Sequence, residues 1–335
     1  MTQADGFKAL VLDERNGRVS AAVRQATDDE LPDGDVTVAV AYSDLNYKDG
    51  MILGGVGRLV KSYPHVAGID FAGVVESSDS PDFRPGDPVI LTGWRVGEVR
   101  WGGYAARARV KSDWLVRLPE GLSLHQSMAI GTAGLTAMFA VMALEAHGLS
   151  PDQEGEVLVT GAAGGVGSVA VALLDALGYT VAASTGRAGQ HGYLRDLGAA
   201  TVVERAELET PPEGPLGKAR WRAAIDNVGG STLAHVLATL MPGGACGAVG
   251  LAAGPELNTS VVPFLLRGIS LLGIDSAFVP IARRVAAWNR LAAELPLDRL
   301  AAMTRTIPLS EVPCHGVEIL QGKVRGRTVI DLGAG

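Results

Sequence analysis

The sequence lacks cysteine clusters and basic blocks. Cys246 and Cys314 are the two cysteines among 335 residues, and they stand far apart in no metal-ligand spacing. This argues against a disulfide framework and against a thiolate zinc site, so we expect no bound metal. The net charge is −7, and no run of Lys and Arg resembles a nucleic-acid-binding arm. Nucleic acid is therefore not an expected partner.

Targeting and membrane signals are also missing. The N-terminal sequence MTQADGFKALVL carries acidic residues and no long apolar segment, so no signal peptide is evident. A membrane span needs roughly 18 uncharged apolar residues in a row, and we expect no stretch of this chain to approach that length. We therefore expect a cytoplasmic protein that makes no membrane contact. With 47% hydrophobic residues, the chain is long enough for two domains with sizeable cores.

The chain is organised around residues 157–187, VLVTGAAGGVGSVAVALLDALGYTVAASTGR. An apolar run precedes a glycine cluster, an apolar helical segment and a second apolar run, which is the pattern of a dinucleotide-binding strand–helix–strand unit. Glycines let the backbone approach a pyrophosphate, and the first N–H groups of the helix attract its negative charge. A glycine-rich structural turn is the alternative. The expected cofactor contacts in this turn are Ala163, Gly164, Gly165 and Val166.

The second strand of this unit ends in Ser184, Thr185, Gly186 and Arg187. An NAD-dependent enzyme would place Asp or Glu here to bind the ribose hydroxyls, and neither is present. Hydroxyls and a guanidinium suit a phosphate instead, so these four residues predict NADPH as the cofactor. The alternative for Arg187 is an ordinary solvated loop residue. Arg205, after the third strand, is a further candidate for the adenosine phosphate.

The order of the predicted elements indicates an α/β protein of two domains. Residues 7–119 contain short β-like runs separated by turns, which suggests a partly closed β domain. Residues 125–146 suggest one or two buried helices, and strands then alternate with helices to about 276, as in a doubly wound parallel sheet. A helix at 281–295 and a strand within 324–332 follow. We assign residues 1–124 and 277–335 to a catalytic domain and 125–276 to the nucleotide domain.

Further cofactor contacts follow from topology. Ligands of doubly wound sheets lie beyond the carboxyl ends of the parallel strands. This predicts Asn227, Leu251 and Ser276 as contacts, and Thr132 from the helix that faces the glycine turn.

Several motifs together resemble the medium-chain dehydrogenase/reductase superfamily. They are the glycine turn TGAAGGVG, GIDFAG at 68–73, PGDPV at 85–89 and DNVGG at 226–230. The resemblance covers nearly the whole chain. It implies a GroES-like partly closed β-barrel for the catalytic domain and a Rossmann fold for the nucleotide domain.

Zinc ligands of the superfamily are missing here. Zinc alcohol dehydrogenases have a Cys in an early loop and Gly-His-Glu before a buried strand, where this chain has Asn46 and 68–70 reads Gly-Ile-Asp. The resemblance therefore implies a zinc-free reductase. The segments SDLNYKD at 43–49, LTGW at 91–94, WGG at 101–103, GTAG at 131–134 and STGR at 184–187 look like the acryloyl-CoA reductase branch. That branch uses NADPH to reduce the C=C bond of acryloyl-CoA to propionyl-CoA. Asp44 departs from the branch, where a second serine is expected, and we expect no effect on the mechanism.

The expected catalytic residues are Asn46, Tyr47 and Lys48. Hydride transfer to the β-carbon of an unsaturated thioester builds negative charge on the thioester oxygen, so the reaction needs fixed donors and a proton for the α-carbon. Asn46 offers an amide, Tyr47 a phenol that can also contact the nicotinamide, and Lys48 a cation. The alternatives are a turn-forming Asn46, a core Tyr47 and a solvated Lys48.

Other side chains are assigned less direct parts. We expect Asp70 to fix the Asn46 loop as a structural carboxylate, and Trp94 and Trp101 to serve packing. Arg283, Arg284 and Arg325 are candidate cations for the phosphates of the CoA substrate. An edge strand at 271–274 and the habit of the family favour a homodimer. Two other functions stay open: an NADPH:quinone reductase and a non-catalytic NADPH-binding sensor.

Overall fold

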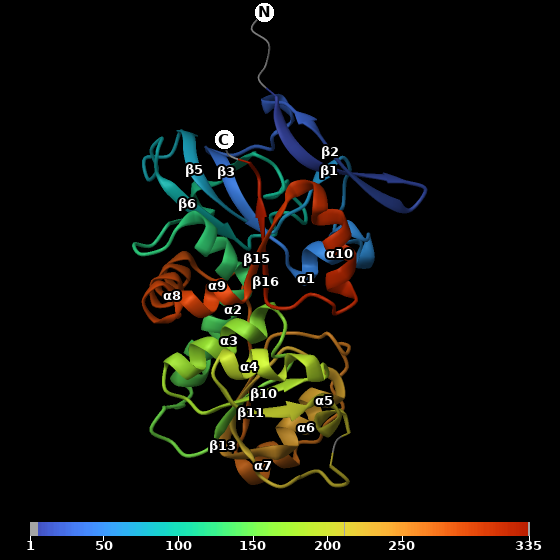
Figure 1. Cartoon of the computed structure of the whole chain (residues 1–335), viewed down its shortest axis with the longest axis vertical. Helices are drawn as coiled ribbons and strands as arrows, with labels where there is room; N and C mark the ends of the chain where they lie inside the picture. The colour runs from blue at the N-terminus through green and yellow to red at the C-terminus, as the bar shows by residue number, and fades with distance from the viewer. Residues whose placement is uncertain (1–5, 211, 334–335) are drawn as a thin grey trace, which may run out of the picture. The chain divides into compact units, whose positions relative to one another are not determined.

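The computed structural model describes residues 6–210 and 212–333. The chain divides into two compact units, shown in Figure 1. Unit 1 comprises Met1–Thr132, Ala277–Ala292 and Thr304–Gly335, and unit 2 comprises Ala133–Ser276 and Ala293–Met303. The first boundary therefore falls inside a helix rather than at the predicted 124/125 junction, and 293–303 groups with unit 2 instead of the catalytic domain.

Unit 1 contains two sheets. A seven-stranded sheet has the order β15-β16-β3-β5-β6-β8, with β7 paired to β3, and a three-stranded sheet has the order β2-β1-β4. Strand β16 pairs antiparallel with β3, so the C-terminal strand joins the first domain as predicted. The strands are β1 (Phe7–Arg15), β2 (Arg18–Ala26), β3 (Val36–Asp44), β4 (His65–Val66), β5 (Asp70–Ser78), β6 (Pro88–Thr92), β7 (Arg107–Val110), β8 (Leu115–Arg117), β15 (Thr304–Pro308) and β16 (Arg327–Asp331).

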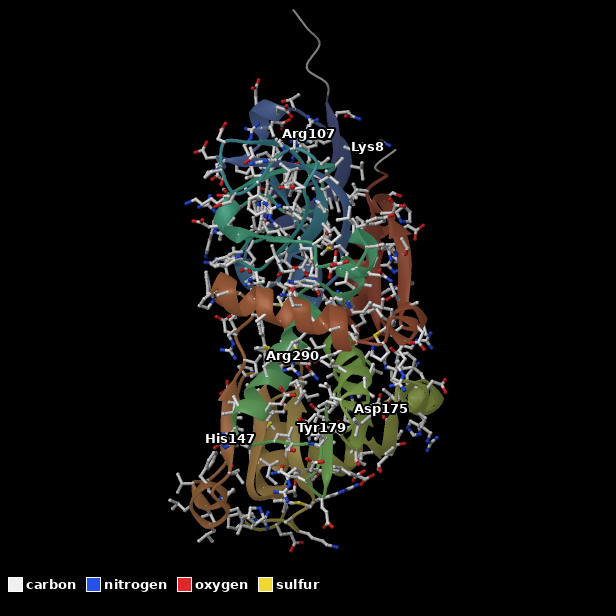
Figure 2. All side chains as sticks on the ribbon, turned by 90° about the vertical axis from the view of Figure 1, so that its left-hand side faces the viewer. Lys8, Arg107, His147, Asp175, Tyr179 and Arg290 are labelled. Atoms are coloured by element: carbon white, nitrogen blue, oxygen red, sulfur yellow. The ribbon has the colours of Figure 1, made fainter. Side chains whose placement is uncertain are left out.

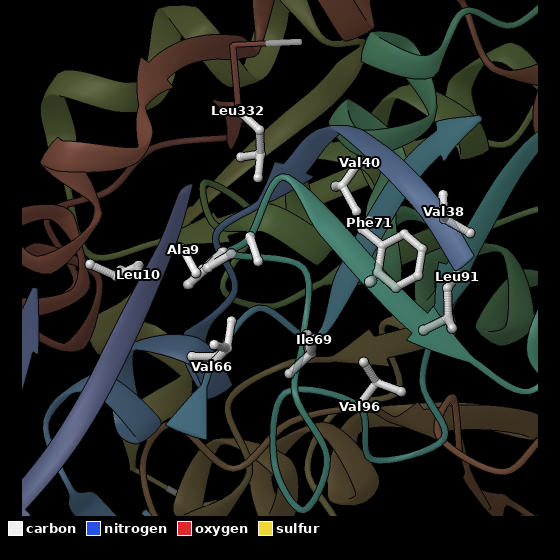
Figure 3. Close-up of a cluster of buried hydrophobic side chains, with 14 of the residues drawn as sticks. Ala9, Leu10, Val38, Val40, Val66, Ile69, Phe71, Leu91, Val96 and Leu332 are labelled. Carbon is white, nitrogen blue, oxygen red and sulfur yellow. The ribbon is translucent and has the colours of Figure 1, made fainter. Parts of the chain in front are cut away.

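Alternating burial explains these strands. In β3, Val36, Val38 and Val40 are buried while the residues between them are partly exposed, so one face of the strand joins the core. Figure 3 shows Val38 and Val40 beside Phe71 and Leu91 of neighbouring strands. The core thus fixes the register of β3, whose last residue leads into the predicted catalytic loop.

The helices of unit 1 support that loop. Helix α1 packs against α10, where Gly50 leaves room for Ile319 and Gly316 leaves room for Leu53. A Cβ at Gly50 would lie 2.6 Å from Ile319, so glycine permits the close approach. The helices are α1 (Tyr47–Leu53), α8 (Ile281–Glu294), which extends into unit 2, α10 (Val312–Leu320) and the short 3-10 turns η1 (Asp28–Glu30), η2 (Val56–Arg58), η3 (Ser112–Trp114) and η5 (Leu309–Glu311).

Helix α2 (Leu124–Ala146) runs from unit 1 into unit 2 and is kinked at Gly131. Gly131 has φ 52° and ψ −161°, a conformation that side chains strongly disfavour. Contrary to the sequence-based expectation, α2 is long and apolar enough to cross a membrane, but 83% of its most apolar window is buried inside the protein. We interpret α2 as a core helix.

Unit 2 is built on a parallel six-stranded sheet of order β11-β10-β9-β12-β13-β14, as predicted. Helices α3 and α4 cover one face, and α5 and α6 lie together on the other (Figure 1). The strands are β9 (Glu156–Val159), β10 (Val181–Thr185), β11 (Ala199–Glu204), β12 (Trp221–Asp226), β13 (Leu240–Ala248) and β14 (Ser270–Gly273). The helices are α3 (Gly165–Ala176), α4 (His191–Asp196) after η4 (Ala188–Gln190), α5 (Arg205–Glu209), α6 (Gly230–Thr239), α7 (Val262–Arg267) and α9 (Leu297–Ala302).

Ion pairs tie distant segments together on the surface of each unit. Arg107 of β7, labelled in Figure 2, bonds to both Glu76 and Asp28. In unit 2, Asp175 at the end of α3 pairs with Arg299 of α9. This pair, with the packing of α9 on α3, joins 293–303 to unit 2.

Candidate active site

Helix α1 begins at the end of strand β3 and presents two of the predicted catalytic side chains. Asn46 is its N-cap, and the Asn46 N–H donates to Asp49 Oδ2 at 2.9 Å. This bond satisfies one donor at the helix start and fixes the first turn. Tyr47 is 49% exposed, so it is not the core aromatic of the alternative interpretation. Its phenol is accessible on a fixed backbone.

Asn46, by contrast, is buried, and its side-chain amide is hydrogen-bonded to other residues of unit 1. Its Nδ2 donates to Asp44 Oδ1 at 2.8 Å and to Asp70 Oδ2 at 3.2 Å, while its Oδ1 accepts from Arg327 at 3.3 Å. Two carboxylates on one side and a guanidinium on the other allow only this amide orientation. The geometry favours a positioning part for Asn46 over the predicted donation to substrate.

Arg327 and Asp44 complete this buried network. Arg327 is 2% exposed and pairs with Asp44 Oδ2, and its Nε donates to the Ala129 carbonyl at 2.8 Å. A Cβ at Gly131 would collide with the Asp44 carboxylate, so the kink in α2 makes room for the pair. Asp44, expected from the sequence to be without effect on the mechanism, therefore holds the amide that begins α1.

Asp70 anchors the network to α2. Its carboxylate accepts from the Thr132 N–H at 2.6 Å and from the Thr132 hydroxyl at 2.5 Å. Asp70 is fully buried, in agreement with the structural part expected for it. Thr132 belongs to unit 1, and its predicted contact with the cofactor stays a prediction.

Asp44, Asp49 and Asp70 are three buried carboxyl groups close to one another, and burial raises the pKa of each of them. Burial raises the pKa of Asp49 to about 7, although hydrogen bonds from backbone N–H groups oppose the shift. Burial also raises the pKa of Asp44 well above its usual range, with the charge of Asp70 adding and that of Arg327 opposing. The pKa of Asp70 is raised by burial against the hydrogen bonds from Thr132. The folded state thus favours protons in this network.

Lys48 points to a different partner. Its Nζ lies 2.9 Å from Glu98 Oε1, and Arg95 Nε lies 3.3 Å from the other oxygen of the same carboxylate. Glu98 is buried at 6% exposure, whereas the Lys48 side chain is 41% exposed. The buried Glu98 carboxylate therefore holds the Lys48 ammonium in place, while the Lys48 side chain remains accessible to a ligand.

In unit 2, the glycine turn has the close backbone packing that a dinucleotide site requires. Gly161 follows β9 with φ 59°, and a Cβ at Gly167 would lie 2.5 Å from the Gly161 carbonyl oxygen. Gly164 is the N-cap of α3, so Gly165 and Val166 offer backbone N–H groups that have no partner within the helix. With Ala163 before them, these residues fit a pyrophosphate.

Asn227 lies beyond the carboxyl end of β12 and carries an unused acceptor. Its Nδ2 donates to the Thr160 carbonyl at 2.7 Å, and its N–H donates to Thr160 Oγ1 at 3.0 Å. Its Oδ1 is buried without a hydrogen-bond partner among the described residues. A buried acceptor of this kind suits a donor on a ligand, such as a nucleotide hydroxyl.

Two arginines contact the segments that carry the predicted phosphate contacts. Arg187 Nη2 donates to the Ala163 carbonyl at 3.2 Å. A Cβ at Gly186 would lie 2.7 Å from Arg205 Nε, which also pairs with Glu209 at 2.8 Å on the exposed side of α5. Ser184 and Thr185 are buried at the end of β10, and Thr185 Oγ1 accepts from the Arg187 N–H at 3.2 Å. The arrangement fits the extra phosphate of NADP.

Leu251 and Ser276 were also predicted to contact the cofactor. Leu251 is 63% exposed and follows β13, and Ser276 is the last residue of the first segment of unit 2. Arg284 is fully buried and donates to Thr92 Oγ1 at 2.8 Å, so its prediction as a surface cation for CoA phosphates is wrong. Arg327 and Glu98 were not predicted from the sequence. For Arg327, the available signal was a charged residue at the start of the apolar strand RTVID.

Across residues 6–210 and 212–333, no group of three or more His, Cys, Asp or Glu side chains is arranged to hold a metal ion.

Comparisons with known proteins agree with this architecture. Residues 32–120 match the alcohol dehydrogenase GroES-like domain, and residues 165–291 match the zinc-binding dehydrogenase family. Acrylyl-CoA reductase AcuI of Ruegeria pomeroyi is 56% identical over 98% of this chain and 100% of its own length. The chain belongs to the medium-chain dehydrogenase/reductase superfamily.

Two further members of the superfamily bear on function. The putative quinone oxidoreductase YhfP of Bacillus subtilis is 43% identical over 97% of this chain and 99% of its own length. The yhdH oxidoreductase of Salmonella enterica, solved in complex with NADP, is 50% identical with a TM-score of 0.95, covering 97% of this chain and 99% of its own.

The raised pKa of Asp49 predicts a pH-dependent stability. Between about pH 4 and pH 7 the folded state holds a proton that the unfolded state has lost, so the free energy of unfolding falls as pH rises. The slope is about 1.4 kcal/mol per pH unit for one such carboxyl, and it levels off above pH 7. Urea unfolding at several pH values measures it. In Asp49→Asn, the dependence of the unfolding free energy on pH should be shallower by the amount that one proton contributes. Asp152 is exposed, so Asp152→Asn should show the same dependence as the parent protein. Equal slopes in all three would contradict the assignment.

Proposed function

We propose that this protein reduces the C=C bond of acryloyl-CoA to propionyl-CoA with NADPH. The near full-length similarity to an acrylyl-CoA reductase carries the proposal. The exposed Tyr47 and Lys48 support it chemically, as do the Arg205 guanidinium beside Gly186 and the Arg187 guanidinium at the glycine turn. When bound, NADPH supplies the hydride that the β-carbon of the substrate accepts.

In this proposal, residues of unit 1 stabilise the negative charge on the thioester and supply the proton for the α-carbon. As the β-carbon gains hydride, negative charge moves to the thioester oxygen, where the Lys48 ammonium stabilises it. The Tyr47 hydroxyl gives its proton to the α-carbon and regains one from solvent, since the side chain is half exposed. Asn46 keeps α1 in place, and Glu98 keeps Lys48 in place. One hydride and one proton complete the saturated product.

A quinone reductase is the second candidate, because the YhfP relative bears that name. A quinone accepts the same hydride but carries no phosphates and no thioester. A passive NADPH sensor is less favoured, since nothing in cofactor binding alone requires an accessible phenol beside a cation held on a buried carboxylate.

We further infer a homodimer that works in the cytoplasm, where NADPH and CoA thioesters are available. Strand β14 is an edge strand of its sheet, and Val261, Leu265 and Leu266 expose 66%, 75% and 70% of their surface nearby in the chain. Apolar side chains beside an unpaired edge suit a second copy. Light scattering should give the mass of two chains, and a single-chain mass would exclude the dimer.

Substrate tests separate these functions. We expect acryloyl-CoA to drive rapid NADPH oxidation, crotonyl-CoA to be slower and free acrylate to be inactive, with propionyl-CoA formed as the product. NADPH absorbance and mass spectrometry of the thioester measure this. Rapid turnover of benzoquinone with none of acryloyl-CoA would overturn the proposal in favour of the quinone reductase.

Arg187→Ala should weaken NADPH binding much more than NADH binding. A lost charge-assisted contact with phosphate corresponds to about tenfold to a hundredfold in Kd, and NADH lacks that phosphate. Calorimetry with both nucleotides measures the change, and Arg195→Ala, exposed on α4, is the matched control. An equal loss for both nucleotides would remove Arg187 from the phosphate site.

Tyr47→Phe should lower kcat by about a hundredfold or more, because a positioned proton donor contributes at least that much. NADPH affinity should stay within about twofold, since only the hydroxyl is removed. Steady-state kinetics and nucleotide titration separate the two effects, with Tyr63→Phe in the same unit as control. Full activity of Tyr47→Phe would show that the Tyr47 hydroxyl is not the proton donor.

A further inference from the structure

Two indole rings of unit 1 stack at a place where several cations gather. Trp94 and Trp114, called here the tryptophan stack, have ring centroids 6.4 Å apart and planes inclined by 13°. Over the Trp114 ring lie Arg100 Cζ at 5.1 Å and Lys111 Nζ at 5.8 Å, and Arg284 Cζ lies 5.3 Å from the Trp94 ring. Such contacts occur roughly once per 70–80 residues in proteins, so three on one pair of rings is a marked concentration.

The three cations are not equivalent. Arg284 is fully buried and hydrogen-bonded to Thr92, so it supports Trp94 from inside the unit. Arg100 is half-buried and Lys111 is exposed. Among the described residues, neither of these two forms an ion pair with a carboxylate, whereas Lys48 and Arg95 both pair with Glu98. Arg100 and Lys111 therefore offer positive charge to a ligand.

The backbone that carries Trp94 is strained and firmly held. Trp94 and Arg95 have φ values of 57° and 56°, although neither is glycine. Non-glycine residues rarely adopt this conformation, and they keep it only where the surrounding structure imposes it. The Trp94 N–H donates to the Ala277 carbonyl at 3.0 Å, and His65 Nε2 bonds to the Gly97 carbonyl at 2.8 Å. The buried side chain of Val96 fixes the loop in the core (Figure 3).

The same loop reaches the proposed catalytic lysine. Glu98 stands between Val96 and Arg100 in the chain, and its carboxylate holds Lys48 Nζ at 2.9 Å. The segment 93–101 thus links Lys48 to the tryptophan stack through covalent structure and one ion pair. A substrate with its reacting thioester at one end and an anionic group at the other could contact both.

We propose that the tryptophan stack, with Arg100 and Lys111, binds the phosphorylated adenosine end of the acyl-CoA substrate. Indole rings stack on a purine, and the two cations attract its phosphates. The pantetheine arm of CoA separates this end from the thioester, so the proposed site need not touch Tyr47. Two carboxylates lie near these cations, the exposed Asp113 and Asp35, which accepts from Ser112. Together with Arg284 beside Trp94, the local charge stays positive. This inference rests on the proposed function for its substrate.

Comparing two thioesters tests the site. Acryloyl-pantetheine has the same thioester and arm as acryloyl-CoA but no nucleotide. For the double variant Arg100→Gln/Lys111→Gln, and for Trp114→Leu, we expect KM for acryloyl-CoA to rise about tenfold with kcat within twofold. Kinetic constants for acryloyl-pantetheine should stay within twofold. An unchanged ratio between the two substrates would overturn the proposal.

The matched control is Arg117→Gln, which removes a cation lying 5.0 Å from the Phe83 ring elsewhere in unit 1. It should leave both substrates unaffected, because that pair lies outside the tryptophan stack.

Direct binding distinguishes failure of this site from failure of the proposed function. Adenosine 3′,5′-bisphosphate is titrated by calorimetry into protein saturated with NADP⁺, so that the dinucleotide site is filled. Binding by the parent protein that is lost in Arg100→Gln/Lys111→Gln supports the site even if acryloyl-CoA is not reduced. No binding by the parent protein, or equal binding by the double variant, would refute it.

Discussion

The start of helix α1 depends on one buried contact, the guanidinium of Arg327 between the Asp44 carboxylate and the Asn46 amide. Leaving a charge unpaired in such a place is strongly destabilising, so each partner constrains the others. Strand β16 brings Arg327, β3 brings Asp44, and the kink of α2 provides the space. Three segments far apart in the sequence therefore fix the direction in which the neighbouring Tyr47 and Lys48 leave the helix.

Much of the fold could be predicted because local patterns and packing agree. The parallel sheet of unit 2 followed from apolar runs alternating with helical segments, and the helix expected at 281–295 is present as α8. Strand β2 was not foreseen, because its residues RVSAAVRQA are mostly exposed and give little alternation. The boundary between the units was missed for a similar reason: α2 continues as one helix, and only the conformation of Gly131 marks the division.

The candidate site was predictable where chemistry is local in sequence. The glycine turn and Arg187 form a short motif. Arg205 lies beside Gly186, and its contact with the cofactor phosphate stays a prediction. The network under α1 was not predictable, since Arg327 is 281 residues from Asn46 and no pattern connects them. Glu98 was missed because a single carboxylate between Gly97 and Val99 reads as a surface residue; its burial arises from the folded loop.

The division of the chain also limits how its parts can be exchanged. The backbone passes between the units at 132/133, 276/277, 292/293 and 303/304, and two of these crossings lie inside α2 and α8. Neither unit is a continuous stretch of the gene. Exchanging unit 2 with that of a relative would need more than one recombination junction. A single junction would interrupt a helix or leave out a segment that belongs to the unit. The phosphate site that we propose around Gly186 is therefore more simply altered by point substitution than by recombination.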